Sequence, residues 1–104
     1  GIDDVCDSFI VDLSGTSWSK EMSIGCSGTY SYNGYWNFLE NAQVADLNGN
    51  IIGSWRTDGD QVIVVTGSDW MNRVTYTGTI NSAMTEMEGT QTSYSSGCWR
   101  ASLY

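Results

Sequence analysis

The chain contains no histidine, and this restricts the chemistry that its 104 residues can carry out. Histidine is the side chain used most often as a general base, as a metal ligand and as the partner of a nucleophilic serine or cysteine. A catalytic site would therefore have to rest on carboxylates, tyrosines, a thiol or Lys20. We predict from this that the protein is not an enzyme and uses no cofactor.

Two pairs of closely spaced carboxylates are the remaining candidates for acid–base chemistry. Asp58 and Asp60 flank a predicted turn, and Glu86 and Glu88 share the polar face of a predicted strand. Two carboxyl groups can hydrolyse a glycoside when one of them has a raised pKa. We expect solvent to keep both pairs ionised, so Glu40, which interrupts an apolar phase, is the acid whose burial would matter most.

A possible metal site begins at Asp46, followed by Asn48 and Asn50, as in the first half of a calcium-binding loop. Such a loop needs a glycine at its sixth position and a glutamate at its twelfth, where this chain has Ile51 and Thr57. A tight hairpin explains the same residues, so we predict no metal site here.

Aromatic side chains are the feature that most favours ligand binding. Trp36, Trp55, Tyr76 and Trp99 all fall on the phase that we predict to face inwards. Flat rings with a single polar group suit sugars, heterocycles and apolar ligands. We predict that these four residues contact a small apolar or sugar-like ligand, with Met87 as an adaptable filler. The alternative is a filled core without room for a ligand.

A second set of aromatic residues falls at or near predicted loops. Exposed rings at loop tips can form a contact surface for a protein or a glycan. The alternative is that these rings cap the ends of the barrel. If the core is filled, these loop aromatics predict an interaction or scaffold module instead of a small-ligand binder. The set comprises Trp18, Tyr32, Tyr35, Trp70 and Tyr94.

The chain has the composition of a β protein: 12 Gly, no Pro, 5 Trp and 6 Tyr, with Ser and Thr throughout. The clearest alternation runs from Arg73 to Ile80, where Tyr76 and Gly78 share a face. Turn dipeptides recur along the chain, at Asn33-Gly34, Asn48-Gly49 and Asp58-Gly59. The pattern predicts one all-β domain over residues 1–104, an antiparallel up-and-down barrel of seven or eight strands, with a β-sandwich as the alternative. Residues 1–8 are expected to form an N-terminal extension.

The N-terminal third has a less regular pattern than the rest. One inward phase is predicted to continue through Met22, Ile24, Cys26, Tyr30 and Tyr32. This assignment predicts that Cys26 faces the interior. The alternation of the last predicted strand places Cys98 on the outer face.

Three cysteines, Cys6, Cys26 and Cys98, fit no zinc-binding spacing. In a small domain rich in Gly, Ser and Thr they predict one disulfide and one remaining thiol. Cys26 and Cys98 would meet if the first and last strands pair, although their predicted faces differ. Cys6, in a freer segment, can reach either partner.

The formal net charge of −8 bears on partners and location. An acidic surface repels phosphate backbones and anionic headgroups, so we expect neither nucleic acid nor membrane insertion. We expect a small molecule or a glycan as ligand, and a monomer or a weak dimer. A disulfide and the apparent prior removal of a signal peptide favour a secreted or periplasmic location.

Several short segments, in their order along the chain, resemble small lipocalin-like domains of bacterial exported proteins and lipoproteins. The segments are SGTSW at residues 14–18, NGNIIGSW at 48–55, YTGTI at 76–80, MEGT at 87–90 and SGCWRASL at 96–103. The resemblance implies an eight-stranded up-and-down barrel of lipocalin or avidin type in an exported protein, and most such domains have no assigned function. It also implies that Arg100 packs over Trp18 in a cation–π contact. Cys98 departs from the pattern, which usually has threonine there.

Overall fold

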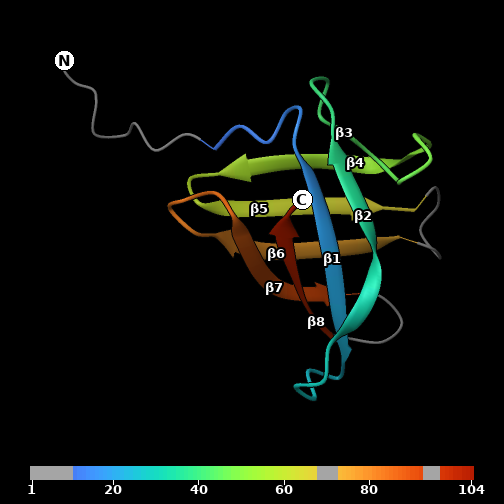
Figure 1. Cartoon of the computed structure of the whole chain (residues 1–104), viewed down its shortest axis with the longest axis vertical. Coiled ribbons are helices and arrows are strands. Elements are labelled where there is room, and N and C mark those ends of the chain that lie inside the picture. The colour runs from blue at the N-terminus through green and yellow to red at the C-terminus, as the bar shows by residue number, and fades with distance from the viewer. Residues whose placement is uncertain (1–10, 68–72, 93–96) are drawn as a thin grey trace.

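The protein forms a closed barrel of eight antiparallel strands, shown in the computed structural model of Figure 1. The structure describes residues 11–67, 73–92 and 97–104, and these contain strands and turns but no helix. Each strand pairs with its neighbours along the chain, and the first pairs with the last. The predicted up-and-down barrel is confirmed, and the sandwich alternative is wrong. The strands are β1 (Ser17–Ile24), β2 (Ser31–Phe38), β3 (Gln43–Ala45), β4 (Ile51–Asp58), β5 (Gln61–Thr66), β6 (Val74–Ile80), β7 (Glu86–Thr92) and β8 (Gly97–Leu103).

Closure of the barrel depends on the register between β1 and β8. Lys20 lies opposite Ala101 and Met22 lies opposite Trp99, so the inward positions of the two strands coincide. In Figure 1, β1 and β2 cross β4, β5 and β6 steeply, as expected for the tilted strands of a small barrel. The ring is narrowest in pairing between β2 and β3, which pair only at Asn37 with Ala45 and Phe38 with Val44, so most of β2 pairs with β1 alone.

One end of the barrel is closed by residues 11–16, which precede β1. Val11 and Leu13 are buried in the same apolar cluster as Phe38 and Val44. Backbone hydrogen bonds between this segment and the end of β2 fix the cover in place. We call this end, where the odd-numbered strands begin, the closed end, and the opposite end the open end.

Trp18, the second residue of β1, fills the closed end of the barrel, which is one of the two placements predicted for it, and is not an exposed loop residue. Its side chain is fully buried. Its indole N–H donates to the Thr16 hydroxyl at 2.9 Å. The covering segment thus satisfies the polar group of the ring while the ring itself fills the barrel.

Buried aromatic rings fill the middle of the barrel. Trp36 contacts Phe38, Tyr76 and Trp99 edge to face, with ring centroids 5.9, 5.0 and 5.2 Å away. Trp99 lies against Gly78, where an added Cβ atom would come within 2.7 Å of the indole ring. A glycine in the middle of β6 is therefore required for this ring to fit.

The chain between β1 and β2 departs from the predicted phase. Met22 faces the interior, but Ile24 is 81% exposed, and Cys26 lies in a turn with φ of 57°. Tyr30 and Tyr32 lie outside the core. The predicted inward run therefore ends at Met22, because Ile24, the last residue of β1, is exposed at the open rim and the turn after it resets the alternation.

Asn33-Gly34 forms an irregularity within β2 and not the predicted hairpin turn. Lys20 pairs with Gly34 while the next residue of β1, Glu21, pairs with Tyr32. Asn33 is thus an extra residue without a partner opposite, as in a β-bulge. Gly34 has φ of 124°, a conformation that favours glycine.

Cys26 and Cys98 form a disulfide at the open end of the barrel. The bond links the turn after β1 to the beginning of β8, across 72 residues of sequence. The opposed faces assigned from the alternation do not apply, because Cys26 lies beyond the end of β1. Cys6 lies outside the described residues.

Candidate functional site

A pocket opens to solvent at the open end of the barrel, with a volume of about 590 Å³. Its walls come from the inward positions of β1, β2 and β6 and from the segments where β4 begins and β5 ends. This size falls within the range of small-molecule sites in proteins, roughly 300–1,000 Å³. The lining residues are Lys20, Trp36, Ile51, Ile52, Gly53, Thr66, Gly67 and Tyr76.

Lys20 is the one basic side chain that lines this pocket. It alternates with Trp18 and Met22 on the inward face of β1, and only 6% of it is exposed. Its ammonium group donates a hydrogen bond to the Tyr76 hydroxyl at 3.2 Å. The same nitrogen lies 4.8 Å from the centroid of the Trp36 ring and 4.5 Å from that of Tyr76. The two rings therefore hold the cation by cation–π contacts.

The surroundings of Lys20 disfavour its charged form. Burial lowers the pKa of Lys20 from its ordinary 10.5 to about 8. Burial also raises the pKa of Tyr76, against a smaller opposing effect from a hydrogen bond with Thr66. In the described part of the chain, the only ion pair joins Arg100 to Glu21 on the outer face. Lys20 is thus charged at neutral pH without a described carboxylate beside it.

The structure brings together two of the five residues predicted to contact a ligand, Trp36 and Tyr76. Trp55 lies elsewhere: it packs on Phe38 and donates its indole N–H to the Leu39 carbonyl at 3.1 Å.

Met87 and Trp99 do not line this pocket, and both are buried in the core. Trp99 donates its indole N–H to the Thr90 carbonyl at 3.0 Å. Met87 and Trp99 therefore lie in the interior as predicted. The open-end pocket is lined by only some of the interior residues, and these two are not among them.

Lys20 is the site residue that sequence reasoning missed as a ligand contact. The sequence contains an indication of it, because Lys20 lies two residues from both Trp18 and Met22 and therefore shares their phase. Because a lysine side chain is normally expected to face solvent, the pattern alone did not lead us to predict that Lys20 faces the interior.

None of the described carboxylates is buried. Among the described residues, the buried polar or charged side chains are Lys20, Ser23 and Gln91, and Glu40 is exposed. Asp60, Glu86 and Glu88 line a second pocket of about 370 Å³, at the end where β6 and β8 finish and β7 begins, and Met87 also lines it. The described residues contain no cluster of three or more acids or cysteines arranged for a metal ion.

The Asp46 carboxylate serves the turn that the sequence analysis favoured over a calcium loop. It accepts the backbone N–H groups of Asn48 and Asn50 at 2.9 and 3.0 Å. These bonds order the hairpin between β3 and β4, as aspartate commonly does in turns.

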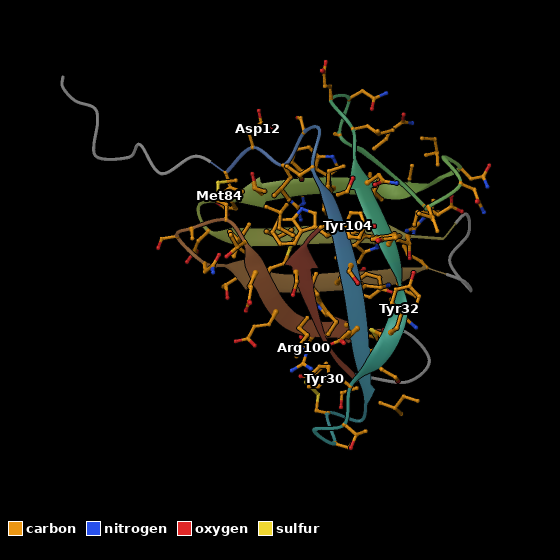
Figure 2. All side chains as sticks on the ribbon, viewed as in Figure 1. Asp12, Tyr30, Tyr32, Met84, Arg100 and Tyr104 are labelled. Carbon is orange, nitrogen blue, oxygen red and sulfur yellow. A yellow bond between two sulfur atoms is a disulfide. The ribbon has the colours of Figure 1, made fainter. Side chains whose placement is uncertain are left out.

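A cluster of tyrosines lies on the outer face near the C-terminus. Tyr35 contacts Tyr32 and Tyr104 edge to face, with ring centroids 6.4 and 4.9 Å away. Tyr32 and Tyr104 are 63% and 82% exposed. Figure 2 shows the side chains labelled Tyr32 and Tyr104 on this face. Trp70 and Tyr94 of the predicted loop aromatics lie outside the described residues.

Arg100 packs on a different ring from the one expected. Its guanidinium lies 4.1 Å from the centroid of Tyr30, beside which it is drawn in Figure 2. It also bonds the Glu21 carboxylate at 2.6 Å. The expected contact with Trp18 is wrong, because Trp18 faces the interior and Arg100 the exterior.

No family model matches this chain, and neither the curated proteins nor the solved structures contain a significant match to it. The part of the chain that the structure describes includes no helix of the length and hydropathy needed to span a membrane.

Proposed function

We propose that this domain binds a small molecule with an apolar body at the open end of the barrel, without catalysing a reaction. The supporting observation is the pocket of about 590 Å³ walled by Trp36 and Tyr76. Ile51 and Ile52 add apolar surface at its entrance. Binding would release water from these walls, which is the main source of affinity in such pockets.

A binding role also agrees with the chemistry available. The chain lacks histidine, and no carboxylate of the described residues is buried. We further propose that the protein acts outside the cytosol. The disulfide between Cys26 and Cys98 supports this, because such bonds persist in oxidising compartments. The resemblance of its segments to small lipocalin-like exported domains points the same way.

The proposal is tested with the uncharged dye Nile red, whose fluorescence rises in apolar surroundings. Ile51 is half exposed and lines the pocket, whereas the similarly exposed Leu47 does not. We expect Ile51→Glu to weaken dye binding about tenfold, because it introduces a charge that the ligand would desolvate. Leu47→Glu is the matched control and should change the affinity less than about twofold. Equal effects of the two substitutions, or no binding to the wild type, would contradict the proposal.

A second candidate function rests on the tyrosine cluster of Tyr32, Tyr35 and Tyr104. Exposed aromatic groups that lie together favour recognition of a protein or a glycan. This candidate predicts binding of oligosaccharides, or reversible dimerisation, that the double substitution Tyr32→Ser with Tyr104→Ser abolishes. Glycan-panel binding and sedimentation measure both outcomes, and neither should respond to Ile51→Glu.

A further inference from the structure

We infer that the ligand of the open-end pocket carries a carboxylate, which the ammonium group of Lys20 binds. The inference rests on the proposed ligand-binding function and adds the chemical class of the ligand: an amphipathic organic monocarboxylate. Lys20 would meet the carboxylate, and Trp36 with the two isoleucines at the entrance would meet its apolar body.

The buried charge of Lys20 has a free-energy cost. Lys20 is more than nine-tenths buried, yet no described carboxylate forms an ion pair with it. A buried charge without an opposite charge destabilises the folded protein, and aromatic rings offset only part of that cost. A methionine would fill the same space without this cost. Because the ammonium group lines the open pocket, an anionic ligand bound there would offset this cost.

The geometry of the donors also supports a carboxylate. A lysine ammonium has three N–H groups, and the Tyr76 hydroxyl accepts one of them at 3.2 Å. The same hydroxyl can donate its own proton. A carboxylate has two oxygens, so one can accept from Lys20 and the other from Tyr76. Both donors line the pocket, which places this pair of contacts within reach of a ligand.

The number of basic residues at the pocket distinguishes a carboxylate from a more highly charged anion. The chain has four basic residues, and of these only Lys20 lines the pocket. A phosphate monoester would bring a second negative charge into apolar surroundings, in a protein whose net charge is already −8. A single positive charge matches a monoanion.

The test compares three ligands that share a decyl chain: decanoate, decanol and decylamine. Their dissociation constants are measured by calorimetry on the whole domain near pH 6.5, where Lys20 is protonated. We expect decanoate to bind about tenfold tighter than decanol, and decylamine to bind weakest. Lys20→Met should abolish the preference for decanoate and leave decanol binding within about twofold. Arg56→Met, which removes an exposed positive charge elsewhere on the barrel, should leave the preference unchanged.

A pH series on the wild type provides a second readout that needs no variant. The pKa of Lys20 is about 8, so the preference for decanoate should fall about tenfold between roughly pH 6.5 and 9.5. Lys20 faces Tyr76 on β6, while its neighbours in register on β2 and β8, Gly34 and Ala101, do not titrate. Decanol binding should not follow this change.

The outcomes separate the two proposals. If decanol binds as tightly as decanoate at both pH values, the carboxylate inference is wrong while ligand binding stands. A preference for decanoate that persists in Lys20→Met also overturns the inference, because another group must then bind the anion. If none of the three ligands binds, the proposed function fails and the inference fails with it.

Discussion

The two ends of the barrel are stabilised in different ways. At the closed end, Val11 and Leu13 of the covering segment and Trp18 of β1 are buried together in the apolar core. At the open end, Lys20 occupies an inward position, and the disulfide joins β8 to the turn after β1. Apolar packing holds the first end together and a covalent bond holds the second.

This difference shows how a chain of 104 residues can keep an open pocket. A domain of this size buries only about two-thirds of its unfolded surface, so its core is small. A pocket reduces that core further, because its walls contact solvent and not one another. Placing the covering segment at one end leaves the other end available for binding. The disulfide then compensates for the missing packing.

The largest expected effect comes from removing that disulfide. In a Cys6→Ala background, which prevents exchange with the third thiol, Cys26→Ala with Cys98→Ala should lower the free energy of unfolding by about 4 kcal/mol. The reason is the closed loop of 72 residues, whose freedom in the unfolded chain the bond restricts. Urea denaturation measures the loss. A change below about 1 kcal/mol would mean that packing already holds the open end.

A somewhat smaller effect is expected at the closed end. Leu13→Ala should lower the free energy of unfolding by about 3 kcal/mol, because it leaves a cavity beneath the covering segment. The affinity for Nile red should stay within about twofold of the wild type, since Leu13 does not line the pocket.

A matched control is Leu47→Ala, on a leucine that is 65% exposed, and it should change stability by less than about 0.5 kcal/mol. Loss of dye binding in Leu13→Ala would show that the two ends are coupled. The separation drawn between them would then be wrong.

The strands were predictable where alternation and turn chemistry agree. In β6, Tyr76, Gly78 and Ile80 are buried as predicted, because tight alternation admits only one orientation. Gly49 and Gly59 adopt φ of 86° and 63° in the two hairpins that their dipeptides predict.

Prediction failed where the same local signal has two structural uses. Asn33-Gly34 has the composition of a hairpin turn, yet here it makes a bulge within β2. Glycine permits positive φ in both cases, so the dipeptide alone does not distinguish a turn from a bulge.

The candidate site was predictable only in part. Alternation placed Trp36 and Tyr76 inside, but it does not say which inward residues face solvent at an open end. That depends on which end residues 11–16 cover, a tertiary contact that the local pattern does not encode. For the same reason Trp99 and Met87, correctly predicted to be inside, lie in the filled part of the barrel.

The smallest of these effects, and the one with the most specific signature, concerns Lys20. Lys20→Met should raise the free energy of unfolding at neutral pH by about 2 kcal/mol, because it removes a buried charge while keeping most of the side-chain volume. Binding and stability would then oppose each other at this residue, as is common at functional sites. Arg56→Met should leave stability within about 0.5 kcal/mol.

The pH dependence of this difference follows from the lowered pKa of Lys20. Below about pH 8, Lys20 is protonated in both the folded and the unfolded chain, so the folded protein bears the full cost of the buried charge. Between about pH 8 and the ordinary value of 10.5, the unfolded chain holds more protons, and the stability of the wild type rises with pH. The advantage of Lys20→Met should therefore shrink by about 2 kcal/mol between roughly pH 8 and 9.5. Urea titrations of both proteins across this range measure it, and an advantage independent of pH would mean that Lys20 is not buried as a cation.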